Sequence, residues 1–600
     1  MPCLDPHSYF DTDQPRTKRL RVKLEVDFQR QVLDGSVVLE LAAPSSGPMD
    51  LDTKGLAIRV VRTLSGASVA HEIAEEEPIL GRRLRLHLPG GTREVAIDYA
   101  TAPDAVALQW LTPAQTEGKR HPFLFSQCQA IHARTMVPLQ DSPAVRVAYQ
   151  AEITVPEPLS AVMSAGPAGS RPGPRPGMRT FLFEMPQPIP SYLMALAVGD
   201  LRSRDLSPRS RVWAEPETVE AAAWEFAGIE EMIVKAEGLF GPYEWDRYDM
   251  LVLPPSFPYG GMENPRMTFL TPTLLAGDRS LVDVVAHELA HSWTGNLVTN
   301  ASMDHFWLNE GTTVWAERRI QEAIHGEDAA VLSWAIGQKA LDQEMERFGA
   351  DSPLTRLRTE MKGVDPDDAF SSIPYEKGAR LLALIERTAG RARFDRFIRD
   401  YIAKYRFTSI TTEEWVAFLE ARIPGVAAQV QVEHWLHDPG MPSNAPVFRS
   451  PALEDLSRLA EGWAAGARPS KEQIARWKPS ETLIFLQRLP RQVDRASCEW
   501  LDANLSLTGR GNYEILVEWL TIAAGSDYEP VFPRVREVLA RVGRMKYLRP
   551  LYTALGRNPR TRALAREIFA AAGPSYHSLS RRVVESVIGK YQEQDGERDR

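Results

Sequence analysis

The sequence predicts a multidomain α+β fold, with a β-rich N-terminal domain, a middle domain rich in helices and an α-helical C-terminal domain. Three observations support this class. The chain has 600 residues, which is too long for one hydrophobic core of ordinary size. Apolar residues alternate with period two in the first third of the chain and recur at helical spacing afterwards. A proline-rich stretch then divides the helical part in two.

Composition excludes several classes of protein. The chain is 44% hydrophobic and 25% charged with a net charge of −9, and no domain-sized excess of Lys and Arg predicts a nucleic-acid or membrane partner. No segment offers about 20 apolar residues for a membrane span, and the N-terminus lacks the apolar stretch of a signal peptide. Cys3, Cys128 and Cys498 are too far apart for a disulfide framework. We therefore expect a cytoplasmic protein and a monomer.

Residues 1–204 form the predicted β-rich domain. Val22, Leu24 and Val26 alternate with polar residues, as in half-buried strands, and turn signals separate such runs. A stretch of glycines and prolines at 165–177 has the composition of a long, exposed connection. We therefore expect a loop there within the domain.

Residues 205–445 form the second domain, and its clearest helix carries the sequence VDVVAHELAHSW. Asp278 or Ser280 is placed to cap that helix. Four prolines in the stretch 437–456 indicate a semi-rigid interdomain connection. Beyond it, helices of ordinary length alternate with short turns, so residues 446–600 are expected to form stacked antiparallel helix pairs.

The same helix contains an HExxH motif with His287 and His291. The spacing places both imidazoles on one helix face, where two nitrogens can bind one zinc ion at about 2.0–2.1 Å. Glu288 lies beside them, outside the coordination shell, and can accept a proton from water that the metal acidifies. Composition alone gives roughly 0.03 such motifs in a chain of 600 residues, so chance is a poor explanation.

A catalytic zinc site needs a third protein ligand and an open position. Glu310, in the segment WLNEG before another helical run, is the candidate. We expect one zinc ion as the cofactor. By contrast, His132 and His305 stand alone in the sequence and are expected to be structural.

The segments HELAHSWTGNLVTN and DHFWLNEGTTVWAE resemble the gluzincin aminopeptidases, family M1 of the metallopeptidases, whose signature is HExxH, eighteen residues and a glutamate. The resemblance implies His287, His291 and Glu310 as zinc ligands and Glu288 as the general base, in agreement with the chemistry above. It also implies a thermolysin-like catalytic domain. Glu317, seven residues after Glu310, resembles a family carboxylate that orients a ligand histidine.

An upstream segment, PYGGMENP, resembles the exopeptidase motif of this family. Glycines permit close approach to an extended peptide, and a carboxylate at the end of a cleft can bind a protonated α-amine. The implied substrate-binding residues are Tyr259, Gly260, Gly261, Met262 and Glu263. We therefore expect short peptides with a free N-terminus as substrates.

Three further segments extend the resemblance. SSIPYEKG resembles the family segment with the catalytic tyrosine, which makes Tyr375 the implied oxyanion donor. FLFSQCQAIHAR and GRMKYLRPLY look like the leukotriene A4 hydrolase and aminopeptidase B branch. They imply Gln127 and Gln129 at the amine-binding end, and Arg544 and Lys546 as a clamp for the free carboxylate of a peptide.

One position departs from that branch. Leukotriene A4 hydrolase has a second tyrosine five residues before the catalytic one, where this chain has Phe370, which lacks a hydroxyl. Asp367 matches the acid of the substrate pocket, which can hold a polar substrate group. We expect a zinc aminopeptidase. The alternatives are a bifunctional enzyme that also hydrolyses a lipid epoxide such as leukotriene A4, and a non-catalytic zinc scaffold that captures peptides.

Overall fold

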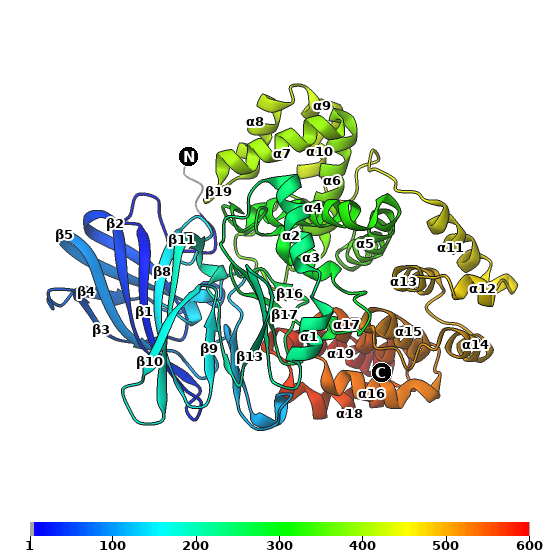
Figure 1. Cartoon of the computed structure of the whole chain (residues 1–600), viewed down its shortest axis with the longest axis horizontal. Coiled ribbons are helices and arrows are strands. Elements are labelled where there is room, and N and C mark those ends of the chain that lie inside the picture. The colour runs from blue at the N-terminus through cyan, green and yellow to red at the C-terminus, as the bar shows by residue number, and fades with distance from the viewer. Residues whose placement is uncertain (1–4, 599–600) are drawn as a thin grey trace.

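The computed structural model describes residues 5–598, with side chains up to Tyr591. The chain forms three regions (Figure 1). Two sheets, coloured blue and cyan, build the N-terminal region; the green middle region combines a sheet with helices; and the yellow to red C-terminal region is helical. The predicted order of a β-rich, a mixed and a helical domain is confirmed.

The N-terminal region contains an eight-stranded sheet in the order β10-β11-β8-β1-β2-β5-β3, with β4 also paired to β5, and a four-stranded sheet in the order β6-β7-β12-β9. Most neighbouring strands are antiparallel, but β1 and β8 are parallel. The strands are β1 (Thr17–Asp27), β2 (Val32–Thr53), β3 (Ala57–Thr63), β4 (Ala70–Ile73), β5 (Arg82–Ala100), β6 (Leu108–Leu111), β7 (Phe123–Ser126), β8 (Arg146–Pro156), β9 (Ser160–Met163), β10 (Gly166–Pro172), β11 (Met178–Pro190) and β12 (Leu196–Gly199).

The period-two pattern marks the buried face of the large sheet. Val22, Leu24 and Val26 are buried, whereas the residues between them are more exposed. The predicted loop at 165–177 is wrong over most of its length, because β10 pairs there with β11 as the outermost strand of the sheet. Nearly all of β10 is exposed, and a strand with one free edge tolerates glycine and proline.

The middle region begins with a five-stranded sheet in the order β13-β14-β15-β17-β16. Its strands are β13 (Arg202–Ser207), β14 (Ser210–Ala214), β15 (Tyr248–Val252), β16 (Gly261–Met262) and β17 (Thr268–Leu270). The boundary that we expected at residue 204 lies inside β13. The sequence pattern missed this sheet because every residue of β15 is buried, so the strand lacks the alternation of a half-exposed strand.

Helices cover the rest of the middle region. They are α1 (Val219–Glu225), α2 (Ile229–Phe240), α3 (Asp283–Ala290), α4 (Trp307–His325), α5 (Glu327–Phe348), α6 (Ile373–Ala389), α7 (Arg391–Tyr405), α8 (Thr412–Arg422), α9 (Val426–Val430) and α10 (Val432–His437), and the short pair β18 (Val298–Asn300) and β19 (Thr408–Ile410) lies among them. Helices α4 and α6 touch at Gly311 and Gly378, where a Cβ on Gly311 would lie 2.7 Å from the Cα of Gly378. The two glycines therefore allow the helix backbones to meet.

The C-terminal region consists of α11 (Pro451–Glu461), α12 (Lys471–Ile474), α13 (Pro479–Arg488), α14 (Arg495–Leu505), α15 (Tyr513–Gly525), α16 (Phe532–Arg541), α17 (Met545–Arg557), α18 (Arg562–Ala572) and α19 (Ser578–Arg598). Their apolar faces form a core of their own, which two residues of α5 join. The N-terminal and middle regions share the other core. The linker before α11 ends at Ser450, whose side chain caps the helix by accepting from the Leu453 amide.

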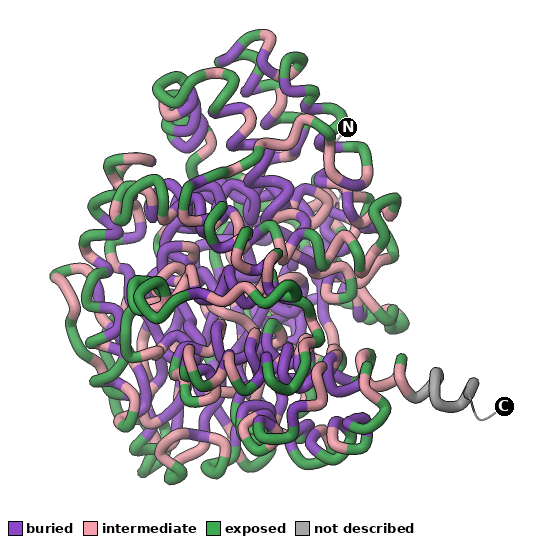
Figure 2. The backbone as a smooth tube through the Cα atoms, turned by 90° about the vertical axis from the view of Figure 1, so that its right-hand side faces the viewer, coloured by how far each residue is buried: buried purple, intermediate pink, exposed green. Residues whose placement is uncertain are grey.

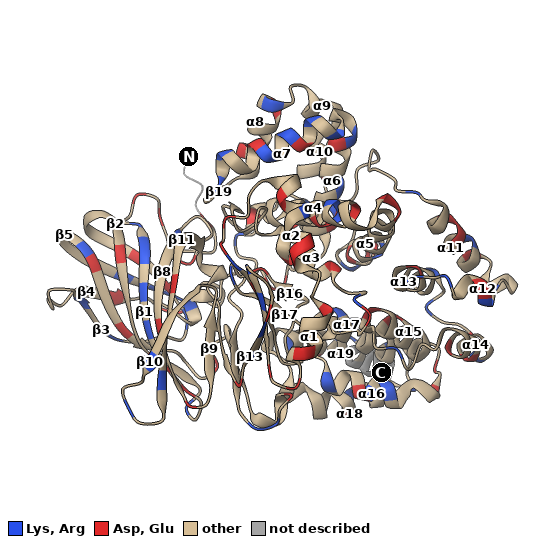
Figure 3. Cartoon of the chain, viewed as in Figure 1, with Lys and Arg blue, Asp and Glu red and all other residues tan. Residues whose placement is uncertain are grey.

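Buried residues fill the centre of the molecule and exposed residues lie at its periphery (Figure 2). Basic and acidic residues are interspersed along most elements (Figure 3). None of the described helices is both long and apolar enough to cross a bilayer. Cys128 and Cys498 are buried free thiols, and Cys3 lies outside the described residues.

Candidate active site

Three side chains from α3 and α4 form a compact set of potential metal ligands. The Nε2 atoms of His287 and His291 are 3.1 Å apart, and they lie 3.4 Å and 3.5 Å from Oε2 of Glu310. Ligands of a tetrahedral zinc ion with bonds of about 2.05 Å are separated by about 3.3 Å. Glu310 Oε2 is buried without a hydrogen-bond partner among the described residues. The donor set therefore fits a zinc ion.

Hydrogen bonds orient both imidazoles. Nδ1 of His287 lies 3.1 Å from Glu317 Oε2, as the family resemblance implied. Nδ1 of His291 lies 3.1 Å from both the carbonyl oxygen of Thr294 and the hydroxyl of Thr313. These contacts on Nδ1 leave each Nε2 free for a metal. We had no sequence signal for the two threonines, because their role depends on the packing of α4 against the end of α3.

The predicted caps of α3 are wrong. The helix begins at Asp283, and its N-cap, Val282, makes no side-chain cap. Asp278 instead accepts from the backbone amide of Ser280. Asp278 thus closes a local turn ahead of the helix, which is a common competing use of an Asp side chain. The hydroxyl of Ser280 accepts from Nδ2 of Asn512.

Glu288 lies between the ligand set and the exopeptidase segment. Glu288 is only 6% exposed. Burial raises the pKa of its carboxyl to about 8, and the negative charges of Glu310 and Glu317 contribute to this rise. Gly261 in β16 packs directly on it. Glu288 is therefore a buried carboxyl beside the ligand set, where a group that exchanges a proton with water is needed.

Two buried polar groups face the other end of the site. Glu263 is 4% exposed, and burial together with the charges of Glu310 and Glu288 raises the pKa of its carboxyl well above the ordinary value. Gln127 is equally buried and donates to the sulfur of Met262 at 3.2 Å. Glu263 Oε1 and Gln127 Oε1 have no partner within the part of the chain that the structure describes. Unpaired buried acceptors are costly, so both point to a ligand with donor groups.

Tyr375 lies on the first turn of α6, beside the ligand set. Its ring stacks on that of His287 at a centroid distance of 6.1 Å. Burial and the neighbouring Glu310 raise the pKa of its hydroxyl well above the ordinary value. The phenol therefore stays protonated and can donate a hydrogen bond to a developing negative charge.

An apolar pocket adjoins this tyrosine. Phe370 forms part of its wall, 5.6 Å from the ring of Tyr259 and 6.1 Å from that of Tyr375. Asp367 also lines the pocket, and it is hydrogen-bonded by His132 and by Arg582. The structural role expected for His132 is confirmed by its contact with the carboxylate of Asp367. Gln129 lines the same pocket, near Tyr259.

Arg544 reaches the exopeptidase segment from the C-terminal region. Its Nη1 donates to the hydroxyl of Tyr547 at 2.6 Å and lies 3.3 Å from Glu514. A Cβ on Gly260 would approach its Nη2 within 2.5 Å. Its Nε is buried without a hydrogen-bond partner among the described residues. One edge of the guanidinium is therefore held by protein groups and the other faces the exopeptidase segment.

Lys546 completes the basic pair, and its Nζ lies 2.8 Å from the carboxylate of Glu514. The sequence pointed to two cations here but not to the acid between them. Backbone bonds from Gly543 to Pro255 at 2.8 Å and from Met545 to Pro258 at 2.9 Å fasten this part of the C-terminal region to the cleft.

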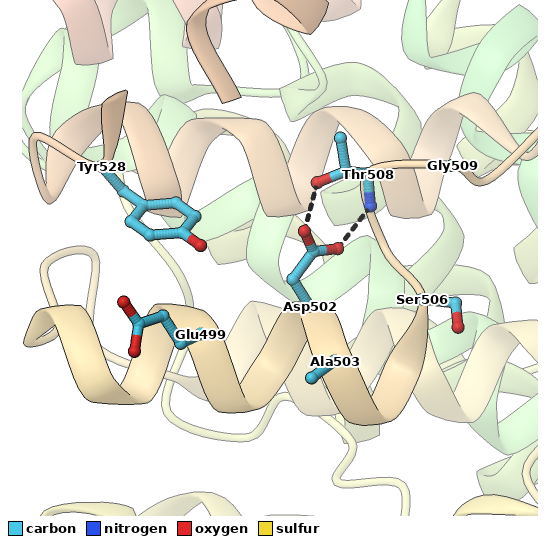
Figure 4. Close-up of a pocket in the computed structure, with 7 residues that line it drawn as sticks. All are labelled: Glu499, Asp502, Ala503, Ser506, Thr508, Gly509 and Tyr528. Atoms are coloured by element: carbon cyan, nitrogen blue, oxygen red, sulfur yellow. Dashed lines mark hydrogen bonds between the residues drawn. The ribbon is translucent and has the colours of Figure 1, made fainter. Parts of the chain in front are cut away.

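A second hollow lies on the surface of the C-terminal helices, lined by Glu499, Asp502 and Tyr528 among others (Figure 4). Both oxygens of Asp502 accept from Thr508, one from its backbone amide and one from its hydroxyl, each at 2.8 Å. Asp502 therefore serves to close the turn after α14. None of the catalytic candidates lines this hollow.

Comparison with known proteins agrees with this geometry. Residues 9–193 match the peptidase M1 N-terminal domain, residues 224–437 the peptidase family M1 domain, and residues 477–588 the leukotriene A4 hydrolase C-terminal domain. Leucine aminopeptidase 2 of Yarrowia lipolytica is 39% identical over 97% of this chain and 93% of its own length. The chain belongs to peptidase family M1. It is therefore a zinc-dependent metallo-aminopeptidase, as the sequence resemblance implied.

Other relatives support the branch of the M1 family. Leukotriene A-4 hydrolase of Xenopus laevis is 39% identical over 92% of this chain and 93% of its own length. The structure of yeast LTA4 hydrolase in complex with bestatin superimposes with a TM-score of 0.90 and 33% identity, covering 98% of this chain and 97% of the other. The M1 zinc metallopeptidase of Deinococcus radiodurans, at 21% identity and a TM-score of 0.58, shares the fold.

Proposed function

We propose that this M1 aminopeptidase removes the first residue from short peptides, with one zinc ion held by His287, His291 and Glu310. The observation that carries the proposal is the position of Glu263. One ligand atom each from Glu263, Glu288 and His291 lies within 4.8 Å of the other two. A carboxylate that binds the α-amine at this distance from the general base admits only the first peptide bond to the reaction.

The residues divide the reaction between them. When bound, zinc would polarise the scissile carbonyl and acidify water. Glu288 accepts a proton from the attacking water and later transfers it to the leaving amine. Tyr375 donates its phenolic hydrogen to the oxyanion. Glu317 holds the imidazole of His287 in place through Nδ1.

Substrate binding uses the groups on either side. Glu263 and Gln127 accept from the protonated α-amine, whereas Gln129 lines the apolar pocket together with Asp367. The strand β16 is the edge of its sheet, so Gly261 and Met262 can pair with an extended peptide along their free side. Tyr259 and Gly260 lead into this strand, and the carbonyl of Gly260 already accepts from the Thr271 amide. The open edge of Arg544, with Lys546 beside it, binds the C-terminal carboxylate of a short peptide.

Initial rates on a panel of aminoacyl amides and tripeptides, with and without a chelator, test the proposal. We expect hydrolysis that the chelator abolishes and that zinc restores. Binding of peptides without hydrolysis would support the scaffold alternative. Hydrolysis within long peptides would instead indicate an endopeptidase.

A lipid-epoxide activity is the second candidate, because the chain is 39% identical to a protein named leukotriene A-4 hydrolase. Phe370 has no hydroxyl to take part in such a reaction. We therefore propose that peptide hydrolysis is the main activity. Incubation with leukotriene A4 and chromatography of the products checks this, and turnover comparable to that of a tripeptide would contradict it.

We further propose that the protein is a monomer in the cytoplasm and acts without nucleic acid or membrane. The buried free thiols of Cys128 and Cys498 support a reducing compartment. Size-exclusion chromatography with light scattering tests the oligomeric state, and a mass of one chain is the expected result.

A further inference from the structure

The pocket beside Tyr375 ends at a carboxylate that already has a cationic partner. Nη2 of Arg582, on α19, lies 2.6 Å from Oδ2 of Asp367. Nε2 of His132 lies 3.1 Å from the same oxygen and 3.3 Å from Oδ1. The three residues come from the three domains, and the side chain of Asp367 is only 12% exposed. The carboxylate of Asp367 is therefore already paired and is not free to bind a positively charged substrate side chain.

The other walls of the pocket offer no replacement acid. Of the described residues that line it, only Asp367 and Arg356 carry a charge. Nε of Arg356 is buried with no hydrogen-bond partner in the described chain. The remaining lining is mostly apolar, and it includes Met303, Phe306, Leu354, Leu357, Met361 and Phe370. The pocket therefore combines an apolar wall with an excess of positive charge.

Asp367 stays ionised although it is buried. Burial by itself raises the pKa of Asp367, but the charges and hydrogen bonds of His132 and Arg582 outweigh it, so the pKa lies below the ordinary value of 3.8. Asp367 is thus charged at neutral pH, and its charge is balanced by Arg582.

We propose that Arg582 is a specificity-determining residue of this aminopeptidase: by pairing with Asp367 it makes the pocket select uncharged, apolar side chains at the first residue of the substrate and exclude lysine and arginine. The proposal rests on the proposed function, since it assigns this pocket to the first side chain. An apolar side chain is stabilised by leaving water. A basic side chain loses its hydration and gains no free carboxylate in return.

The test replaces Arg582 by methionine, which keeps length and helix propensity but removes the charge. The side chain of Arg582 is 49% exposed, so the variant should fold. We expect the ratio of kcat/KM for an arginyl amide to that for a leucyl amide to rise at least about tenfold, the effect of one charge-assisted hydrogen bond. Arg566→Met, an exposed arginine on α18, is the matched control and should leave the ratio unaltered.

A double variant identifies the carboxylate. In Asp367→Asn with Arg582→Met the gain for the arginyl amide should disappear, because no acid remains to bind it. The proposal would be overturned if folded Arg582→Met had the same arginyl-to-leucyl ratio of kcat/KM as the wild type. It would also be overturned if the gain for the arginyl amide persisted in the double variant. Arg582→Gln provides a second neutral replacement should the methionine variant be unstable. Absence of leucyl hydrolysis in the wild type would instead contradict the proposed function.

Discussion

Gly261 lies against Glu288 so closely that a Cβ on the glycine would come within 2.4 Å of Oε1 of the carboxyl. The glycine belongs to β16, the edge strand of the catalytic sheet, and the acid belongs to α3. On the proposed mechanism, a peptide aligned along β16 would place its first peptide bond over Glu288. Any side chain at this position would push Glu288 away from the ligand set.

We predict that Glu288→Gln retains zinc but loses nearly all peptidase activity. The three ligands remain, whereas the group that accepts the proton is gone. General acid–base groups contribute about 10²–10⁴-fold, so turnover should fall by at least that range. Metal content by mass spectrometry and initial rates on a tripeptide check this. More than half of the wild-type turnover with normal zinc content would rule out the role of Glu288.

Acetylation of the substrate amine should abolish cleavage. It removes the positive charge that the buried carboxylate of Glu263 needs as a partner. The comparison is between a tripeptide and its N-acetylated form, assayed at equal concentration with the wild-type enzyme. Efficient hydrolysis of the acetylated peptide would exclude Glu263 as the amine anchor.

Arg544→Ala should impair tripeptide hydrolysis by roughly 10–150-fold in kcat/KM, the equivalent of about 1.5–3 kcal/mol for a charge-assisted hydrogen bond. A small aminoacyl amide should be affected much less, because it has no carboxylate. Arg557→Ala, an exposed arginine at the end of the same helix α17, is the control. Equal losses on both substrates, or none on either, would remove Arg544 from the clamp.

Glu376, next to Tyr375 on α6, joins three helices. Its carboxylate lies 2.6 Å from Arg318 of α4 and 2.5 Å from Arg380, and the guanidinium of Arg318 lies 4.0 Å from the ring centroid of Trp334 on α5. Burial raises the pKa of this carboxyl, but the two arginines outweigh burial and lower it below 4.5. The ionised form thus stabilises the fold at neutral pH.

Glu376→Gln should lower the free energy of unfolding by about 3 kcal/mol at pH 7, because it leaves two buried arginines without their counter-ion. A lowered pKa contributes stability above the unfolded-state pKa and loses it as pH falls through the folded-state value, so the difference from wild type should shrink below pH 4.5. Urea titrations of wild type and variant at pH 7 and below pH 4.5 measure the difference in the free energy of unfolding. Glu346→Gln, an exposed acid on α5, is the control, and an undiminished difference at low pH would contradict the prediction.

Much of the catalytic centre could be predicted because it depends on short-range spacing. His287 and His291 lie one helical turn apart wherever that helix is placed, and Glu288 necessarily lies beside them. Glu310, Glu263 and Tyr375 were recognised by the motifs around them. The resemblance implies that these three residues share a site, and the packing of α4, α6 and the sheet within the middle region brings them together.

Errors arose where the environment overrides the local pattern. β15 is buried along its whole length and shows no alternation. The segment at 165–177 has the composition of a loop, yet most of it pairs as an edge strand. Asp278 accepts from the backbone amide of Ser280, and the hydroxyl of Ser280 accepts from Asn512, so neither side chain caps α3. In each case the local structure depends on which other segments of the chain pack against or pair with these residues. The order of residues in the sequence does not reveal those neighbours.

The class of fold, the zinc-binding helix and the chemistry of its side chains could be predicted from the sequence, because they follow from residue type and from spacings of a few residues. Which distant groups share a site depends on how the helices and sheets pack. Asp367 meets Arg582 across a separation of 215 residues, and Glu514 meets Arg544 across 30. Such contacts arise when helices and sheets bury their apolar faces together. The packing of whole domains then determines which acid and which base become an ion pair.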